Sequence, residues 1–438
     1  MREMKNSGVA WIGEIPKDWK ISKIKNISVS LKSGGTPDSS KDEFYVDKEV
    51  GIPWVAIADM SDKPYITYTQ KYITEEARKS KNLTIFEAGT ILYAMYASVG
   101  KVSVLGVKAT INQALLAISL KKGIDDAYCT FALNAWEPYI ISESNGTTQF
   151  NLNANKVANL QIPMPPENRQ RIISDCINGN CVKVDSLIAN VQAQIEKLKA
   201  YKQSLITEVV TKGLDPNAPM KDSGVEWIGK IPAHWGTAKL QYCAELRSGI
   251  TLGKKYPKDI KLVERPYLRV ANVQSGGVTL ENIKTVQVTE EEDAQYRLTA
   301  GEVLMTEGGD RDKLGRGCVW NGQIEPCLHQ NHIFALRTSK NLDPQFLSYV
   351  TASKIGRVYF DITAIKTTNL ACTNSSKVLA FKLSLPPITE QQRITVHLNN
   401  KCSQIEQLIS LKESKIEKLQ QYKRSLIYEY VTGKKEVV

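Results

Sequence analysis

The sequence IEKLKAYKQSLITEVVT at residues 195–211 returns as IEKLQQYKRSLIYEYVT at residues 416–432, with 12 of 17 positions identical at an offset of 221. Each copy belongs to a longer stripe of apolar residues in alternating steps of three and four, the spacing of a coiled-coil seam. We assign to the seam Leu187, Ile195, Leu198 and Leu205 in the first copy, and Leu408, Ile416, Leu419 and Leu426 in the second. A helix from about residue 168 to 211 would be roughly 65 Å long. One such helix cannot bury its stripe alone, so we expect the two copies to pair, although each could instead pack on its own domain.

A second repeat shows that the whole chain is duplicated. The sequence MKNSGVAWIGEIPKDW at residues 4–19 returns as MKDSGVEWIGKIPAHW at residues 220–235, with 11 of 16 positions identical at an offset of 216. A Pro-Pro pair precedes each helical block, at residues 165–166 and 386–387, where it stops a strand and allows a helix to begin. A period above 200 residues indicates two domain-sized copies. We therefore predict an antiparallel intramolecular helix pair with pseudo-twofold symmetry.

Between these repeats lie two variable blocks with strand-like character. Short β-branched and aromatic runs, at residues 52–57, 90–93, 102–107, 267–273 and 303–306, alternate with Gly, Asn and Asp turns. They predict an α+β chain with two mixed α/β domains, each with a curved and largely antiparallel sheet, separated by the two long helices. The expected boundaries are 1–164 for the first domain, 165–215 for the first helix, 216–385 for the second domain and 386–438 for the second helix.

Composition limits the class of protein. The chain has 438 residues, of which 42% are hydrophobic and 24% charged, and these are globular proportions. No apolar run of about 18 residues occurs, so we expect no membrane span, and the charged start of the chain argues against a secretory signal. The eight cysteines form no CxxC pair, which favours reduced thiols in the cytoplasm. The net charge of +11 suits a polyanionic partner such as DNA.

Searches for catalytic and cofactor motifs give no match. The sequence lacks a GxxxxGK[ST] phosphate loop, a complete GxGxxG and the Asn/Asp-Pro-Pro-aromatic site of a DNA amino-methyltransferase. The residues Cys318, Cys327, His329 and His332 lack zinc-ligand spacing, so we expect no metal and place His329 and His332 on a DNA face or against loop backbone. These absences argue against the main alternative, a fused methyltransferase or nuclease. A purely structural coiled coil would leave the two diverged domains unexplained.

Comparing the two halves separates shared from diverged polar residues. Gly100-Lys101 aligns with Gly315-Arg316, Gln113 with Gln330, and residues 147–149 with residues 367–369. We expect shared residues to serve as scaffold or to contact phosphate, and diverged loop residues to read bases. The predicted DNA-binding residues are Gly34, Gly35, Thr36, Lys101, Gln113, Thr147, Thr148, Gln149, Arg247, Lys254, Lys255, Arg269, Arg311, Arg316, Gln330, Asn331, Lys366, Thr367, Thr368 and Asn369.

These motifs together resemble a known family. The pattern SGxxWIGxIPxxW at residues 7–19 and 223–235, SGGTP at 33–37, Ile52-Pro53-Trp54, Asn112-Gln113 and PPxxxQxxI before each long helix is similar to the DNA specificity subunits of type I restriction-modification systems. The resemblance implies two target recognition domains that each read half of a bipartite DNA sequence, with the helices as a spacer. It also implies docking of two methyltransferase subunits and of restriction subunits. S-adenosylmethionine, ATP and magnesium would belong to those partners, so this chain is expected to hold no cofactor and to catalyse nothing. The second domain lacks the GGTP loop, since Arg247-Ser248-Gly249-Ile250-Thr251 stands there.

Overall fold

The chain divides into two compact units that are built from the same kinds of elements. A computed structural model describes residues 2–48, 50–60, 65–96, 98–143, 152–274, 276–309, 314–315, 317–366 and 371–437. Unit 1 comprises residues 1–191 and 414–438, and unit 2 comprises residues 192–413. The long helices α5 (Glu167–Lys212) and α10 (Ile388–Val431) each contribute one half to either unit. Each unit is thus a mixed domain joined to two half-helices, which confirms the predicted pseudo-twofold repeat.

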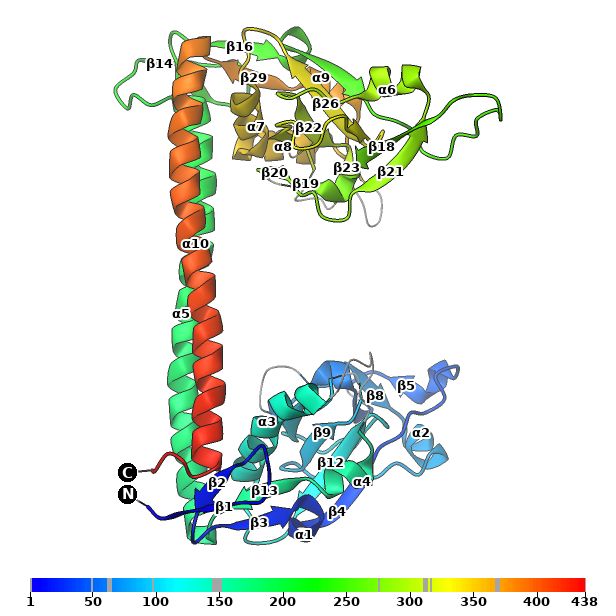
Figure 1. Ribbon diagram of the computed structural model, residues 1–438, viewed down its shortest axis with the longest axis vertical. Coiled ribbons are helices and arrows are strands. Elements are labelled where there is room, and N and C mark those ends of the chain that lie inside the picture. The colour runs from blue at the N-terminus through cyan, green and yellow to red at the C-terminus, as the bar shows by residue number, and fades with distance from the viewer. Residues whose placement is uncertain are drawn as a thin grey trace. The chain divides into compact units, whose positions relative to one another are not determined.

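The domain of unit 1 is built on two sheets (Figure 1). A five-stranded sheet has the order β4-β12-β9-β10-β7, and a four-stranded sheet has the order β11-β6-β8-β5. Most neighbours are antiparallel, whereas β10 with β7 and β11 with β6 are parallel. The strands are β3 (Lys20–Lys23), β4 (Ser28–Ser33), β5 (Tyr45–Val46), β6 (Ile52–Val55), β7 (Tyr65–Ile66), β8 (Lys71–Ile73), β9 (Ile91–Ala94), β10 (Val102–Leu105), β11 (Thr110–Ile111), β12 (Leu115–Leu120) and β13 (Gln161–Met164). The helices are α1 (Ile24–Ile27), α2 (Glu75–Ser80), α3 (Asp126–Glu143) and α4 (Ala154–Ala158).

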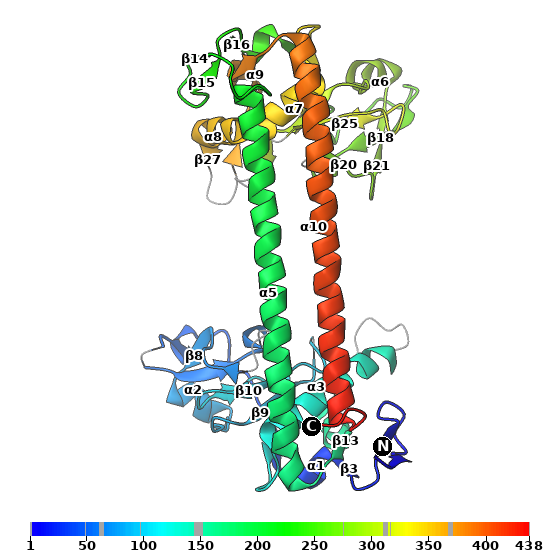
Figure 2. The same ribbon diagram turned by 90° about the vertical axis from the view of Figure 1, so that its left-hand side faces the viewer.

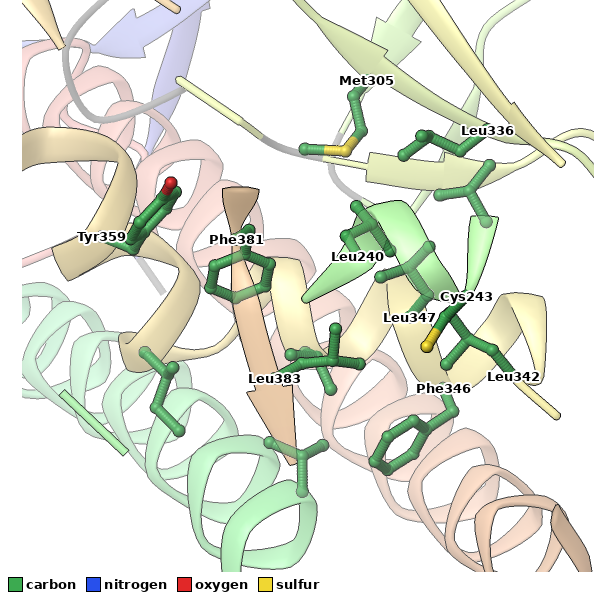
Figure 3. Packing of buried hydrophobic residues seen from close by; sticks show 14 of the residues in the cluster. Leu240, Cys243, Met305, Leu336, Leu342, Phe346, Leu347, Tyr359, Phe381 and Leu383 are labelled. Atoms are coloured by element: carbon green, nitrogen blue, oxygen red, sulfur yellow. The ribbon is translucent and has the colours of Figure 1, made fainter. Parts of the chain in front are cut away.

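The domain of unit 2 repeats this plan, but each of its two sheets has one strand fewer. Its main sheet has the order β17-β26-β22-β24, and a second sheet has the order β21-β18-β25. The strands are β16 (Gly236–Lys239), β17 (Ala244–Ser248), β18 (Val263–Leu268), β19 (Val273–Gln274), β20 (Gly277–Val278), β21 (Lys284–Val288), β22 (Val303–Thr306), β23 (Gly308–Gly309), β24 (Gly317–Val319), β25 (Leu328–His329), β26 (Ile333–Thr338), β27 (Ile365–Lys366), β28 (Ala371–Cys372) and β29 (Lys382–Leu385). The helices are α6 (Glu290–Tyr296), α7 (Pro344–Ala352), α8 (Lys354–Thr363) and α9 (Ser375–Ala380). Figure 3 shows the core that Leu240, Phe346, Phe381 and Leu383 form beside the long helices.

The long helices pair antiparallel, as the two views in Figures 1 and 2 agree. In unit 1, the Nζ of Lys423 donates to Oδ1 of Asp185 at 2.7 Å. In unit 2, Lys202 forms an ion pair with Glu406, and Lys412 donates to Oε1 of Gln194 at 2.5 Å. The residue numbers of the contacts decrease along α10 as they increase along α5, so the two helices run antiparallel.

The register corrects one part of the predicted seam. Leu187 is 52% exposed and Leu408 is 47% exposed, whereas Ile188 and Ile409 are partly buried in their place. Residues 184, 188, 191 and 195 keep the alternating steps of four and three. Leu187 and Leu408 therefore lie beside the seam and not in it. The other predicted members are Ile195 and Leu426, which are buried, and Leu198, Leu205, Ile416 and Leu419, which are half-buried.

A buried glutamine in the first turn of each long helix ties the helix to its domain. Gln170 donates to the carbonyl of Pro165 at 3.2 Å and accepts from the backbone N–H of Asp125 at 3.0 Å. Gln391 repeats both bonds with Pro386 and Asp343, each at 2.8 Å. Because the two amides satisfy backbone groups that would otherwise be buried without partners, they fix where each helix leaves its domain.

The repeated tryptophan motif packs against the C-terminal end of each long helix. In unit 1 it forms the hairpin β1 (Met4–Asn6) and β2 (Glu14–Pro16), and in unit 2 the hairpin β14 (Met220–Asp222) and β15 (Lys230–Pro232). Trp19 lies in one apolar cluster with Tyr430 and Val431 of α10, and Trp235 lies in the matching cluster with Val210 of α5. The motif therefore packs against the C-terminal end of α10 in unit 1 and of α5 in unit 2.

Candidate nucleic-acid interface

In unit 1, a glycine loop after β4 meets the turn between β11 and β12. A Cβ atom on Gly34 would stand 1.9 Å from the carbonyl oxygen of Ile111, so only glycine allows this approach. The N–H of Gly35 donates to the same oxygen at 3.0 Å, and the indole N–H of Trp54 donates to the carbonyl of Gly35 at 3.0 Å. The backbone of the loop is therefore held against the sheet.

This approach brings two predicted site residues together. The hydroxyl of Thr36 makes a short hydrogen bond with Oε1 of Gln113, although the two residues are 77 positions apart. Gln113 is exposed and Thr36 is half-buried. The hydroxyl and the amide hold each other in place and form a small polar platform at the surface.

Unit 2 builds the same junction without the GGTP sequence. A Cβ atom on Gly249 would stand 2.1 Å from the carbonyl oxygen of His329, which matches Gly34 above Ile111. The N–H of Ile250 donates to His329 at 2.8 Å, and the N–H of Asn331 donates back to Ile250 at 2.9 Å. The scaffold role of the first glycine therefore carries over to the second half, and Thr251 stands two residues after Gly249 as Thr36 stands after Gly34.

The strand register corrects one predicted equivalence. The N–H of Asn112 donates to Val55, and the N–H of Gln330 donates in the same way to Leu268, each at 2.9 Å. The paired strands β6 with β11 and β18 with β25 confirm this alignment. Gln330 therefore matches Asn112, and Asn331 is the residue that matches Gln113. Identity of the two glutamines misled the sequence comparison by one position.

Arg247, one of the predicted DNA-contacting cations, forms an ion pair with a buried acidic side chain. Arg247 donates to Oε1 of Glu302 at 3.1 Å, and Arg337 donates to the same oxygen at 3.0 Å. The Glu302 side chain is only 2% exposed. Because a buried carboxylate requires such partners, Arg247 stabilises the domain and is not a free base-reading group. We correct the base-reading role expected of it.

The loop that carries Lys254 is anchored in a similar way. Lys254 donates to Oε1 of Glu292 at 2.6 Å, and the hydroxyl of Tyr256 donates to Oε2 of Glu292 at 2.7 Å. Burial raises the pKa of Glu292, but these two hydrogen bonds, a third from the backbone of Thr289 and the charge of Lys254 together hold the pKa below its ordinary value. Asp293 pairs with Arg265 at 3.1 Å and also with Arg297. The acidic run at residues 290–293 was the sequence signal for these anchors.

The remaining predicted residues are placed as follows. Arg269 donates from Nη2 to the carbonyl of Asn282 at 3.0 Å and is half-buried. Lys255 is exposed, and Lys101, Gln330 and Asn331 are half-buried. Thr147, Thr148, Gln149, Arg311, Arg316, Thr367, Thr368, Asn369 and the side chain of Lys366 lie outside the described residues.

One of the two histidines near β25 differs from expectation. His329 is 1% exposed, and within the described part of the chain neither of its ring nitrogens has a hydrogen-bond partner. Burial, with a smaller contribution from Arg247, lowers the pKa of His329 to about 4. His329 therefore belongs to the neutral core and not to a DNA face. His332 is exposed at the surface, where its Nδ1 lies 2.6 Å from Oε2 of Glu307.

Comparison with known proteins adds a family to this geometry. Residues 16–199 match the family described as type I restriction modification DNA specificity domain. The specificity subunit of the MjaVIII type I restriction enzyme of Methanocaldococcus jannaschii is 24% identical over 437 residues, covering 96% of this chain and 93% of that one. The EcoKI specificity subunit of Escherichia coli is 25% identical over 241 residues, 54% of this chain and 49% of that one.

Solved structures share the fold. A chain from work on assembly and conformational transition of the type I R-M system has a TM-score of 0.68 at 15% identity, covering 95% of this chain and 98% of that one. The HsdS subunit from Thermoanaerobacter tengcongensis has a TM-score of 0.50 at 14% identity and covers 96% and 98% of the two chains. No helix in the described ranges is long and apolar enough to cross a bilayer. With its repeated domains and paired helices, the chain is similar to the DNA specificity subunits of type I restriction-modification systems.

Proposed function

We propose that this chain reads a bipartite double-stranded DNA sequence, with residues 1–164 contacting one half-site and residues 216–385 the other. Residues 165–215 and 386–438 then form the helices between the two readers. The observation that carries this proposal is the repeated junction at Gly34 and Gly249, where one backbone arrangement presents different side chains. A shared scaffold with diverged surface groups is what two readers of different sequences require.

From this likeness we infer that the chain recognises DNA and assembles with the other subunits of the complex without catalysing a reaction itself. We assign base reading to Thr36 and Gln113 in the first half and to Asn331 in the second. An amide can accept from and donate to an adenine edge in the major groove. Exposed Lys255 and half-buried Lys101 are assigned to phosphate contact, which adds affinity for any sequence.

The helix pair offers two matched surfaces for partner subunits. Leu187 and Tyr422 are exposed at the same level of the pair in unit 1, as the Asp185–Lys423 contact fixes the register there. Leu408 and Tyr201 repeat this arrangement in unit 2. Exposed apolar residues beside a seam mark an interaction site. Because the surface occurs twice by the internal repeat, we propose that each copy docks one methyltransferase subunit.

Under this proposal the cofactors belong to the partners. S-adenosylmethionine would be bound by the methyltransferase subunits, and ATP and magnesium by the restriction subunits. The complex would act in the cytoplasm, where the DNA of a prokaryotic cell is accessible. Copurification of the chain with each partner, followed by metal and nucleotide analysis, tests this division.

Binding to substituted duplexes tests the two-reader assignment. The chain, purified with its methyltransferase subunits, is titrated against duplexes that carry single base changes in either half-site. We expect Gln113→Ala to relax preference only in the first half-site and Asn331→Ala only in the second, by about 1–3 kcal/mol per lost bidentate contact. Lys255→Ala should weaken binding to all sequences and lower the salt slope by about one. Lys79→Ala, on α2, serves as the control. A change at both half-sites from either amide variant would contradict independent readers.

The docking surfaces need a separate test. Leu187→Ser with Tyr422→Ser should remove one bound methyltransferase subunit, and Leu408→Ser with Tyr201→Ser the other, as measured by the mass of the complex in solution. Val396→Ser is the matched control, because Val396 is 60% exposed on α10 and lies more than three turns before Leu408. Full occupancy in the quadruple variant would rule out this face as the docking site.

A further inference from the structure

The seams of the two long helices are nearly interchangeable. At an offset of 221 the same residue occurs at both positions of these pairs: Cys181 and Cys402, Ile188 and Ile409, Ile195 and Ile416, Leu198 and Leu419, Lys202 and Lys423, and Leu205 and Leu426. Seam residues determine which helices pair. On these positions alone, each helix would fit a second copy of itself as well as it fits the other helix.

The two ion pairs across the helices do not discriminate between these pairings. Asp185 with Lys423 and Glu406 with Lys202 are related by the internal repeat, since 185 corresponds to 406 and 202 to 423. If a second α10 replaced α5, Glu406 would occupy the place of Asp185 and would still face Lys423. Both acid–lysine contacts therefore survive the exchange.

The third contact across the pair behaves differently. Lys412 donates from Nζ to Oε1 of Gln194 at 2.5 Å. The repeat partner of Gln194 is Lys415, and the repeat partner of Lys412 is Val191. In a pair of two α10 helices, Lys412 of each chain would face Lys415 of the other, and this would happen twice. Like charges at such positions destabilise a helix pair.

We propose that Lys412, Gln194 and Lys415 direct α5 to pair with α10 and disfavour association of two chains through α10. The pairing itself follows from the helix contacts alone. Its consequence rests on the proposed function: two paired α10 helices would bring two copies of the second domain together, and the complex would read a target with two identical half-sites. The lysine pair therefore keeps the target asymmetric.

A single exposed residue gives the sharpest test. Lys415→Gln changes a side chain that lies exposed on α10, and in a pair of α10 helices it replaces each Lys–Lys contact with the Lys–Gln contact of the native pair. We expect the dissociation constant of the full-length dimer, measured by sedimentation equilibrium, to fall at least about fivefold. Lys418→Gln, also exposed on α10, is the control for loss of one positive charge and should match the wild type.

A charge-conserving exchange provides the second test. Moving the lysine to the other helix, with Val191→Lys and Lys412→Val together, keeps the net charge but sets a lysine at 191 against Lys415 in the native pair. Two α5 helices would then gain the Lys–Gln contact with Gln194. We expect this variant to be the most dimeric of the set.

These measurements separate the pairing from the function. Equal dimerisation of Lys415→Gln and Lys418→Gln, with a monomeric double exchange, would overturn the proposal. If the variants do dimerise, binding to a duplex with two copies of the second half-site supports its consequence for DNA reading. Dimers that show no preference for that duplex would contradict the two-reader function while leaving the pairing rule intact.

Discussion

The Nζ of Lys423 donates to Oδ1 of Asp185 at 2.7 Å, from a seam position on one helix to the flank of the other. The side chain of Lys423 is 31% exposed, so its charge reaches the surface while its methylenes cover the seam. The same geometry recurs between Lys202 and Glu406. Lysine in the seam is thus compatible with a stable helix pair.

Reversing the charge of Asp185 should lower stability, and reversing the charge of Lys423 as well should restore it. Asp185→Lys is expected to lower the free energy of unfolding by about 1 kcal/mol, because a half-exposed attraction becomes a repulsion. Asp185→Lys with Lys423→Asp should recover most of the loss. Thermal unfolding of the four chains of this double-mutant cycle measures the coupling, and additive losses would mean that the two residues do not interact in solution.

The seam itself should respond strongly to truncation. Leu426 is 3% exposed in one apolar cluster with Cys181, so Leu426→Ala is expected to destabilise unit 1 by about 2–4 kcal/mol through lost burial and the cavity left behind. Leu411→Ala, at an exposed position of the same helix, should change stability by less than about 0.5 kcal/mol. Chemical denaturation of both variants provides the comparison, and equal losses would contradict the assigned seam.

Glu302 should be important for the stability of unit 2. Glu302→Gln keeps the size of the side chain but removes the charge that Arg247 and Arg337 share. We expect a loss of about 1–2 kcal/mol, because the two guanidinium groups lose a charged hydrogen-bond acceptor but stay partly exposed to solvent. Glu264→Gln is the surface control. Melting of unit 2 by calorimetry gives the result, and a neutral effect of Glu302→Gln would contradict the stabilising role assigned to this ion pair.

Burial of His329 predicts a dependence of stability on pH. Because its pKa is lowered to about 4 in the folded chain, the unfolded chain binds more protons between that pH and its ordinary value near 6.5. Stability therefore falls as pH decreases through this window, by about 2 kcal/mol between pH 7 and pH 5.

The control for this prediction comes from the first half of the chain, where Ile111 occupies the matching position. His329→Ile should reduce the pH dependence of unfolding by that amount, because the isoleucine carries no proton in either state. Denaturant titrations at pH 5 and pH 7 give the change in the free energy of unfolding with pH for the wild type and for the variant. An unchanged slope in the variant would show that other groups cause the dependence.

Much of this architecture was predictable from the sequence because repetition is visible in the letters. The duplicated helices and tryptophan motifs indicated two domains, two long helices and a pseudo-twofold relation, and the strands at residues 91–94, 102–105 and 303–306 followed from local composition. Local periodicity also located the seam, since apolar spacing is a property of the sequence. It could not choose between Leu187 and Ile188, because both fit a stripe that drifts by a fraction of a turn.

Tertiary structure decided what depended on contacts between distant segments. Gly34 acquires its role only when β11 approaches it, and Gln113 meets Thr36 across 77 positions. The match of Asn331 to Gln113 appeared only from strand register, which is set by backbone hydrogen bonds and not by residue identity. Arg247 looked like a loop cation until Glu302 was seen beside it. Charge and spacing in the sequence show which groups a chain has, but burial and pairing in the fold determine which of them remain available to a ligand.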